Sequence, residues 1–282
     1  METEGNERYA CTLSPDLLKR AVEELNEPEN NEERLKAIDQ LRDSYDEAKH
    51  GPLCRKDDAF ILRFLRAKKF DQAKALKVLI NWHQVQVEYE KIFTRMKSPA
   101  LFQPLIESEC LYILPGDAKD GACVMHYRPG LLKDVDIWDI MAYSVYSMEK
   151  VLEDEKYQIT GMRSIEDMEN FSFTSMFREI SPTALAKMQA VWLDAMPMRF
   201  RGSHCLNEGK IYDIMMKIFR PFLKQKILDR IHLHGKDLQS LQNFFPAENL
   251  PPSLGGTGPT TEECMKLWTD KVTADWPQDT AL

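Results

Sequence analysis

The stretch CLYILPGDAKDGACVMHY, residues 110–127, marks the point where the sequence changes from a helical to a β pattern. Its two ends, CLYIL and ACVMHY, are short apolar runs of the kind that forms buried strands. Between them lie Pro115, Gly116, Asp117 and Gly121, which are residue types that favour turns. We therefore predict two neighbouring strands that pair as a hairpin or lie close together.

The residues before this stretch have a helical pattern. Ser14 followed by Pro15 is typical of a helix N-cap with proline in the first turn. A second helix is indicated by apolar residues three and four positions apart, at Leu35, Ile38, Leu41 and Tyr45. We expect residues 1–95 to form an all-helical unit.

The residues after this stretch alternate between helical and β patterns. ITGMRSI (159–165), AVWLDAM (190–196) and RGSHCL (201–206) are each predicted to form a strand, and helices are predicted from Asp136 and from Ser181. This alternation is typical of the α/β class, with helices on the faces of a sheet. We predict an α/β domain over residues 96–258, followed by a C-terminal tail, residues 259–282, that is turn-rich at first and then polar and mostly exposed.

Composition limits the class of protein. The chain has 282 residues and a net charge of −8, which disfavours binding to nucleic acid unless positive charge is concentrated locally. Its six cysteines have no CxxC spacing, so a disulfide framework or a zinc knuckle is not expected. The N-terminus lacks the apolar stretch of a signal peptide, and no apolar run approaches the roughly 18 residues of a membrane span. We expect a soluble, cytoplasmic protein.

Enzyme motifs are absent from the sequence. No phosphate-binding loop, GxSxG elbow or HExxH pair is present, and Gly255-Gly256-Thr257-Gly258 is interpreted as a turn. His232 and His234 are either metal ligands on one strand face or structural histidines, and the second interpretation is favoured. Asp117 and Asp120 are either an acid pair or part of a polar turn. We predict a protein that is not an enzyme and has no cofactor.

Positive charge is concentrated in residues 196–230, which hold eight basic and three acidic side chains, a net charge of +5 that leaves −13 for the remainder. Within this segment, one helix face is apolar, at Ile211, Ile214, Met215, Ile218, Phe219, Phe222 and Leu223. Pro221 is expected to split the segment into two helices. Two interpretations remain open: a surface helix that covers the sheet, or a lid that docks on an anionic membrane.

Three long runs resemble the CRAL-TRIO lipid-binding family, and within it the branch of the alpha-tocopherol transfer protein and the cellular retinaldehyde-binding protein. They are FILRFLRAKKFDQAKALKVLINW (60–82), the segment from Met196 to RIHLHG (230–235), and FFPAENLPPSLGG (244–256). The resemblance implies that the helical unit packs on an α/β sandwich whose mostly parallel sheet encloses a hydrophobic pocket. It also implies a gate helix over this pocket, at about residues 207–223.

The resemblance carries site residues over to this chain. The implied ligand-binding residues are Ser144, Met148, Phe173, Met188, Val191, Ile214, Met215, Ile218 and Leu223. The implied phosphoinositide-binding residues are Arg199, Arg201, Lys226 and Arg230. Met148 and Glu166 stand where the tocopherol carriers have a serine and an apolar residue, so the resemblance does not identify the ligand.

The function implied is that of an intracellular carrier. It binds one hydrophobic ligand, such as tocopherol, a retinoid or another isoprenoid, and exchanges it at phosphoinositide-bearing membranes, including endosomal ones. The alternative is a phosphoinositide- or phospholipid-binding transfer protein or signalling adaptor. Two further classes remain: an isoprenoid enzyme, for which Glu166 is the candidate acid and pairing with Arg163 or Arg178 the structural alternative, and a protein-interaction module without a small-molecule ligand.

Overall fold

The computed structural model describes residues 8–133, 135–172 and 191–276, without the side chains of Val191, Trp192 and Ile211. Within the described residues, the chain forms two compact units. The first comprises residues 8–90, 154–159 and 191–199, and the second comprises the others. Among the described helices, none is long and apolar enough to cross a membrane.

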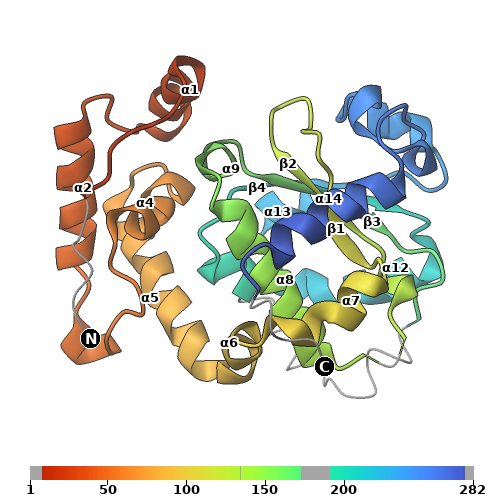
Figure 1. The fold of residues 1–282 in the computed structure, drawn as a ribbon, viewed down its shortest axis with the longest axis horizontal. Coiled ribbons are helices and arrows are strands. Elements are labelled where there is room, and N and C mark those ends of the chain that lie inside the picture. Colours follow the sequence, from red (N-terminus) through yellow and green to blue (C-terminus); the bar gives the residue numbers. More distant parts are fainter. Residues whose placement is uncertain (1–7, 134, 173–190, 277–282) are drawn as a thin grey trace. The chain divides into compact units, whose positions relative to one another are not determined.

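The first unit begins with five helices, which Figure 1 shows in red to orange. They are α1 (Pro15–Leu25), α2 (Asn31–Asp43), α3 (Glu47–His50), α4 (Asp58–Ala67) and α5 (Gln72–Glu88). Side chains that precede these helices accept hydrogen bonds from first-turn amides, as Ser14 does from Leu17 and Asp57 from Phe60. The predicted helical pattern of this region is confirmed.

A buried ion-pair network holds the first unit together. Glu27 accepts hydrogen bonds from Arg34 at 2.7 Å and from Arg66 at 2.8 and 2.9 Å, and all three side chains are fully buried. Arg66 also pairs with Glu155 of α9 (Glu155–Thr160) at 2.9 Å. Burial disfavours the charge of Arg66, but Glu27 and Glu155 outweigh it and hold its pKa above the ordinary value. Two carboxylates, those of Glu27 and Glu155, therefore balance the charges of two buried guanidiniums.

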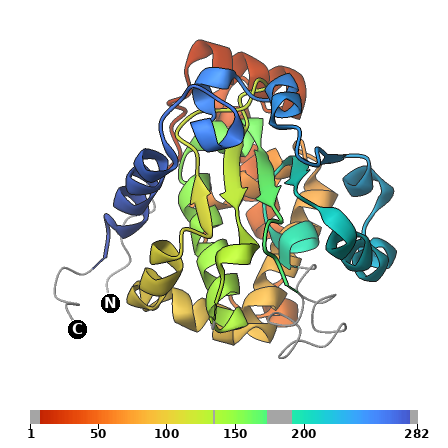
Figure 2. The same ribbon diagram turned by 90° about the vertical axis from the view of Figure 1, so that its right-hand side faces the viewer.

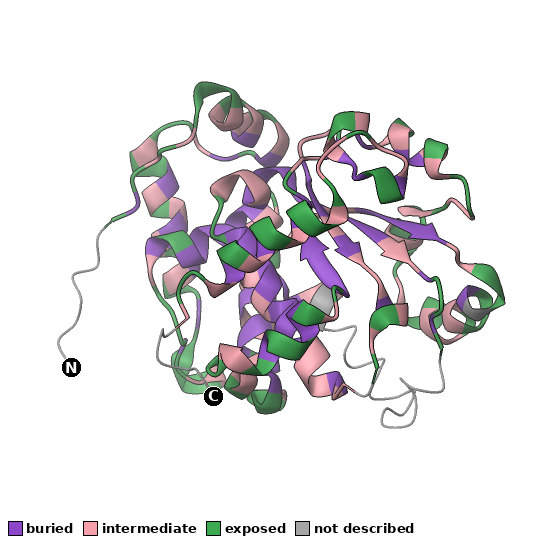
Figure 3. Ribbon diagram, turned by 45° about the vertical axis from the view of Figure 1, so that its right-hand side comes forward, coloured by how far each residue is buried: buried purple, intermediate pink, exposed green. Residues whose placement is uncertain are grey.

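The second unit contains a five-stranded sheet in the order β1 to β5. The strands are β1 (Leu111–Ile113), β2 (Cys123–Tyr127), β3 (Met162–Asp167), β4 (Phe200–Leu206) and β5 (Ile231–Leu233). β1 and β2 pair antiparallel, which confirms the predicted strand pair, and the three other pairings are parallel. Figure 3 shows β1, β2 and β4 buried over most of their length, whereas β5, at the edge of the sheet, has no buried residue.

Helices and 3-10 turns surround this sheet. They are α6 (Glu90–Met96), η1 (Pro99–Phe102), α7 (Gln103–Glu107), η2 (Pro129–Leu131), α8 (Ile137–Leu152), α12 (Gly209–Phe219), η4 (Arg220–Phe222), α13 (Gln225–Leu228), η5 (Leu238–Asn243), η6 (Ala247–Asn249), η7 (Pro252–Leu254) and α14 (Thr261–Thr273). In Figure 2, α14 lies beyond the β1 edge and α12 beyond the β5 edge. The predicted α/β class is confirmed.

One predicted element is wrong, and one helix was not predicted. AVWLDAM was expected to be a strand, but Val191–Ala195 forms a π-helical turn, η3, whose carbonyl at Asp194 accepts a hydrogen bond from Asn81 of α5. The tail was expected to be turn-rich at first and then polar and mostly exposed, and the structure adds a helix there, α14. A capping box formed by Thr260 and Glu263 starts this helix, and its apolar stripe is buried.

The register gives the sheet two chemically different faces. Because side chains alternate along a strand, Ser164 and Glu166 share one face with their β4 partners, Ser203 and Cys205. The β5 residues on this face are Ile231 and Leu233. The opposite face carries Tyr112, His126, Arg163, His204 and His232.

Replacing Glu27 with glutamine should strongly destabilise the first unit. Without the negative charge of Glu27, Arg34 and Arg66 stay buried but lose the carboxylate they share. Removing one partner of a buried ion pair lowers the free energy of unfolding by about 3 to 5 kcal/mol. Denaturant unfolding monitored by circular dichroism measures this loss. Glu29→Gln is the control because Glu29 is exposed. Equal, small losses in both variants would contradict the structural role of the network.

Candidate functional site

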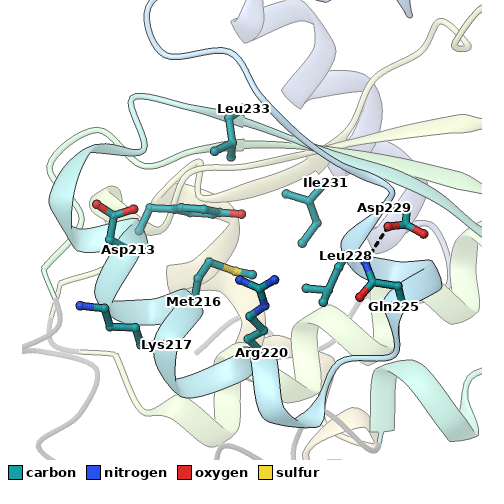
Figure 4. A pocket seen from close by; sticks show the side chains of 10 residues that line it. Asp213, Met216, Lys217, Arg220, Gln225, Leu228, Asp229, Ile231 and Leu233 are labelled. Atoms are coloured by element: carbon teal, nitrogen blue, oxygen red, sulfur yellow. Dashed lines mark hydrogen bonds between the residues drawn. The ribbon is translucent and has the colours of Figure 1, made fainter.

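A groove lies between α12, α13 and β5, at the edge of the sheet (Figure 4). Its volume is about 650 Å³, within the range of roughly 300 to 1,000 Å³ that is common for ligand pockets. The residues that line it are Tyr212, Asp213, Met216, Lys217, Arg220, Gln225, Leu228, Asp229, Ile231 and Leu233. The groove therefore has an apolar floor and a rim that carries charges of both signs.

The start of α12 is attached to the end of β5. The carboxylate of Glu208 accepts hydrogen bonds from the amide of Gly235, with both oxygens at 3.0 Å. The amide of Asn207 donates to the carbonyl of Gly235 at 2.8 Å, and its side chain donates to Asp167 at 2.8 Å. Asn207 and Gly209 have φ angles of 53° and 43°, so the chain turns through the left-handed region here. This turn sets the direction in which α12 leaves the sheet.

Tyr212 places α12 over the face of the sheet that carries Glu166. Its side chain is only 6% exposed, and burial together with Cys205 and Glu166 raises its pKa. Met216 projects toward Ile231 in Figure 4, and Tyr212, one helical turn earlier, lines the same groove. One stripe of α12 therefore covers the floor of the groove.

Glu166 is a polar position on this face. One of its carboxylate oxygens accepts hydrogen bonds from the hydroxyl groups of Ser164 at 2.9 Å and Ser203 at 2.8 Å. Its charge contributes to raising the pKa values of Tyr127 and Cys205, both of which burial raises most. The suggested pairing with Arg163 is wrong because Arg163 occupies the opposite face and pairs with Asp120.

The predicted ligand-binding residues divide into three groups. Ser144 and Met148 are buried in α8. On the gate segment, Ile214 is 51% exposed, whereas Met215, Ile218 and Leu223 are half-buried. Phe173, Met188 and the side chain of Val191 lie outside the described residues. The groove is lined by the neighbouring stripe of α12 instead, so the assignment of these residues to a ligand stays a prediction.

The exposed side of the α12 segment combines apolar and basic residues. Ile214 and Phe222 are 51% and 56% exposed. Exposed basic side chains surround them in the sequence, at Lys210, Lys217, Arg220, Lys224 and Lys226. We call these seven residues the α12 surface.

Arg201 and Arg230 belong to a cluster of guanidinium groups. In the register of the sheet, Arg163 of β3 pairs with Gly202 of β4, and Arg230 precedes β5 at the same level. Arg201 donates to the carbonyl of Thr160 at 2.7 Å, and Arg230 donates to the carbonyl of Phe200. Burial, together with the positive charges of Arg201 and Arg163, lowers the pKa of Arg230.

The other two predicted phosphoinositide-binding residues lie elsewhere in the chain. Lys226 is exposed on α13, four residues before Arg230. Arg199 belongs to the first unit, where it donates to the carbonyl of Ile159 and pairs with Glu24 at 3.3 Å. The structure therefore brings Arg201 and Arg230 close to Arg163, and the phosphoinositide-binding role of all four predicted residues stays a prediction.

The histidines of β4 and β5 form a hydrogen-bonded chain. Arg163 can only donate, so Nε2 of His204 accepts its hydrogen bond at 3.3 Å and the ring proton lies on Nδ1. That proton is donated to Nε2 of His234 at 3.0 Å, and His234 contacts Ser240 at 2.5 Å. His232 stacks on His204 with a centroid distance of 4.8 Å. These contacts favour the structural interpretation of His232 and His234, and the described residues contain no group of three or more ligands suited to a metal ion.

The comparisons with known proteins decide the family. The CRAL/TRIO domain model matches residues 107–256, which is more than half of the chain, and the CRAL/TRIO N-terminal domain model matches residues 17–81. The chain belongs to the CRAL/TRIO family. This family consists of proteins that bind and transfer lipophilic ligands and are generally not enzymes.

Individual CRAL/TRIO proteins resemble the chain over most of its length. Alpha-tocopherol transfer protein-like of Homo sapiens is 34% identical over 251 residues, which are 88% of this chain and 72% of that protein. Clavesin-1 of Rattus norvegicus is 35% identical over 267 residues, covering 91% of this chain and 72% of that protein. The crystal structure of Sfh5 superposes with a TM-score of 0.55 over 90% of this chain and 92% of that chain, and its 14% identity supports the fold alone.

The stability of this CRAL/TRIO domain should fall in mild acid. Burial, with His232 and Arg163, lowers the pKa of His204 to about 3, so the folded protein keeps this ring neutral while the unfolded chain protonates it near pH 6.5. The contribution of neutral His204 to the free energy of unfolding is therefore complete above pH 6.5 and is lost as the pH falls toward 3. The loss is on the order of 2 kcal/mol at pH 5. Denaturant unfolding from pH 7.5 to 4.5 measures the slope. His204→Leu should reduce this slope, and an unchanged slope would show that His204 is not the group responsible.

Proposed function

We propose that this protein is an intracellular carrier of a single hydrophobic ligand, exchanged at phosphoinositide-bearing membranes. The ligand class is tocopherol, a retinoid or a similar isoprenoid, bound on the sheet face beneath α12. The observation that carries the proposal is the position of α12, whose one stripe covers an apolar groove while its exposed side is apolar and basic. Membership of a lipid-binding family supports it. The site of action proposed is the cytoplasmic surface of endosomal or other phosphoinositide-rich membranes.

The energetics of transfer explain why a carrier is needed. An isoprenoid with some twenty buried methylene-like groups loses about 0.8 kcal/mol for each one exposed to water, on the order of 15 kcal/mol in total. The apolar groups of the groove, including Leu228, Ile231 and Leu233, can replace the contacts that the membrane provides. The same contacts make release into water slow. Exchange therefore requires an event at the membrane that moves α12 away from the groove.

Binding of the α12 surface to an anionic membrane is the event that we propose. Each lysine or arginine near an anionic bilayer contributes about 1 kcal/mol, so its basic side chains give reversible attachment to a protein whose net charge is −8. Ile214 and Phe222 can then enter the interface, where their exposed area leaves water. In this proposal the membrane binds the state in which α12 has left the groove more tightly than the closed state. The difference between these two affinities stabilises the open state.

The position of Glu166 limits the kind of ligand that we propose. The carboxylate of Glu166, although it accepts hydrogen bonds from Ser164 and Ser203, is an unfavourable neighbour for a plain hydrocarbon because covering a charged group with apolar atoms removes it from water. We therefore propose a ligand with a polar end that meets Glu166 and an apolar body that lies along the groove.

Charge reversal of the basic residues should abolish vesicle-stimulated transfer. Arg201→Glu together with Lys226→Glu replaces two attractive charges with two repulsive ones, while affinity for ligand in solution should be unchanged. Fluorescent tocopherol transferred from the protein to phosphatidylinositol bisphosphate vesicles measures the rate.

The matched control reverses two exposed lysines of α14, Lys266 and Lys271, which lie outside the α12 surface. This control should transfer at the wild-type rate. Unchanged transfer in the Arg201 and Lys226 double variant, with both proteins folded, would refute the membrane part of the proposal.

A second candidate function is a phospholipid transfer protein or signalling adaptor, whose pocket ligand is a phospholipid. The arginine cluster favours it because guanidinium groups suit phosphate. Transfer of radiolabelled phosphatidylinositol between vesicles separates the two candidates. Efficient transfer of this lipid, with no competition from tocopherol or retinol, would favour the second.

A further inference from the structure

The cross-strand row Arg163, Gly202, Arg230 brings two guanidinium-bearing residues together across a glycine. A Cβ atom at Gly202 would lie 2.9 Å from Nη1 of Arg163 and 3.1 Å from the carbonyl oxygen of Arg230. Glycine therefore lets the side chain of Arg163 lie flat over β4, toward Arg230. The row depends on the absence of a side chain at its centre.

A β-bulge adds Arg201 to the same place. The register between β3 and β4 shifts after the pair Met162 and Phe200, so that Arg163 pairs with Gly202 and Arg201 is the extra residue. Bulges commonly redirect a side chain in this way. The pKa of Arg230 is lowered mainly by burial and also by the charges of Arg201 and Arg163, and that of Asp120 is lowered mainly by Arg163 with a smaller contribution from Arg201.

Asp120 holds Arg163 in position. Its two carboxylate oxygens accept from Nε of Arg163 at 3.2 Å and from Nη2 at 2.9 Å, and the guanidinium also lies 5.6 Å from the ring of Phe244. The exposed fraction of the side chain is 15% for Arg163 and 30% for Asp120. Three guanidinium groups and one carboxylate thus share a partly exposed position at the start of β3, β4 and β5.

We propose that Arg163 is a third guanidinium of the phosphate-binding site formed with Arg201 and Arg230, and that Asp120 is an internal counterion that weakens this site. The inference rests on the proposed membrane function and names residues outside the set that the family resemblance implied. Asp120 occupies the fork of Arg163 that a phosphate group would otherwise use. Its negative charge also repels an incoming phosphate, so binding is strong enough to attach the protein and weak enough to release it.

The proposal predicts opposite effects for the two members of one ion pair. Arg163→Gln should weaken binding to phosphatidylinositol bisphosphate vesicles about fivefold, the effect expected for one charge near an anionic surface. Asp120→Asn should strengthen it by about the same factor or more. The double variant should bind about as wild type does, and Arg163→Lys should keep most of the affinity because it keeps the charge. Vesicle cosedimentation measures all four affinities.

The control pair lies elsewhere in the second unit. Glu109 pairs with Arg128 at 3.0 Å, so Glu109→Gln removes one carboxylate from an arginine without touching the cluster, and its affinity should equal that of wild type. Soluble inositol trisphosphate, titrated by calorimetry, distinguishes a headgroup site from general attraction to a charged surface. We expect the Asp120→Asn gain with this soluble probe too.

The outcomes separate this inference from the proposed function. Wild-type protein that binds bisphosphate vesicles no better than phosphatidylcholine vesicles overturns both. Wild-type binding with Arg163→Gln and Asp120→Asn unchanged overturns the inference alone, as does a loss of affinity in Asp120→Asn, which would make the ion pair structural. A gain confined to vesicles, with none for inositol trisphosphate, also overturns it. If Asp120→Asn does not fold, the comparison of Arg163→Gln with Arg163→Lys decides, and equal affinities overturn the proposal.

Discussion

The attachment of α12 to the end of β5 is the constraint on which the rest of the site depends. Glu208 and Asn207 bind Gly235 through three hydrogen bonds, so the helix must leave the sheet at this point and in one direction. Tyr212 then packs over the sheet face, while Ile214 is exposed to solvent. A single attachment therefore creates both the covered groove and the exposed α12 surface.

The two faces of the sheet in the second unit carry different kinds of side chains. One face carries Ser164, Glu166 and Ser203, and it is the face on which we propose that the ligand binds. The other carries Arg163 and the histidine chain, which is packed against Phe244 and Phe245. The arginine cluster lies where the strands begin. Headgroup binding and ligand binding can therefore occupy different surfaces that are joined through β4 and β5.

Much of the architecture is encoded in local sequence patterns. The turn residues between CLYIL and ACVMHY and the periodicity before Pro52 were sufficient to predict the strand pair and the helices, because both signals act over a few neighbouring residues. AVWLDAM misled because a short apolar run does not distinguish a strand from a buried helical turn. The helix in the tail was missed although Thr260 and Glu263 form a capping box, with Cys264 and Trp268 four residues apart.

The site was harder to predict because it depends on strand register. The amphipathic pattern identified α12 but not its rotation, and the stripe that lines the groove contains Tyr212 and Met216. Arg163 lies 36 residues before Arg199, outside the basic segment, and only pairing across Gly202 brings it to Arg230. The central claim is that the chain holds one lipophilic molecule beneath α12. Mass spectrometry of an organic extract of the protein purified from eukaryotic cells tests it most directly: the account predicts one lipid species at close to one molecule per chain, and a folded protein that yields no lipid would contradict it.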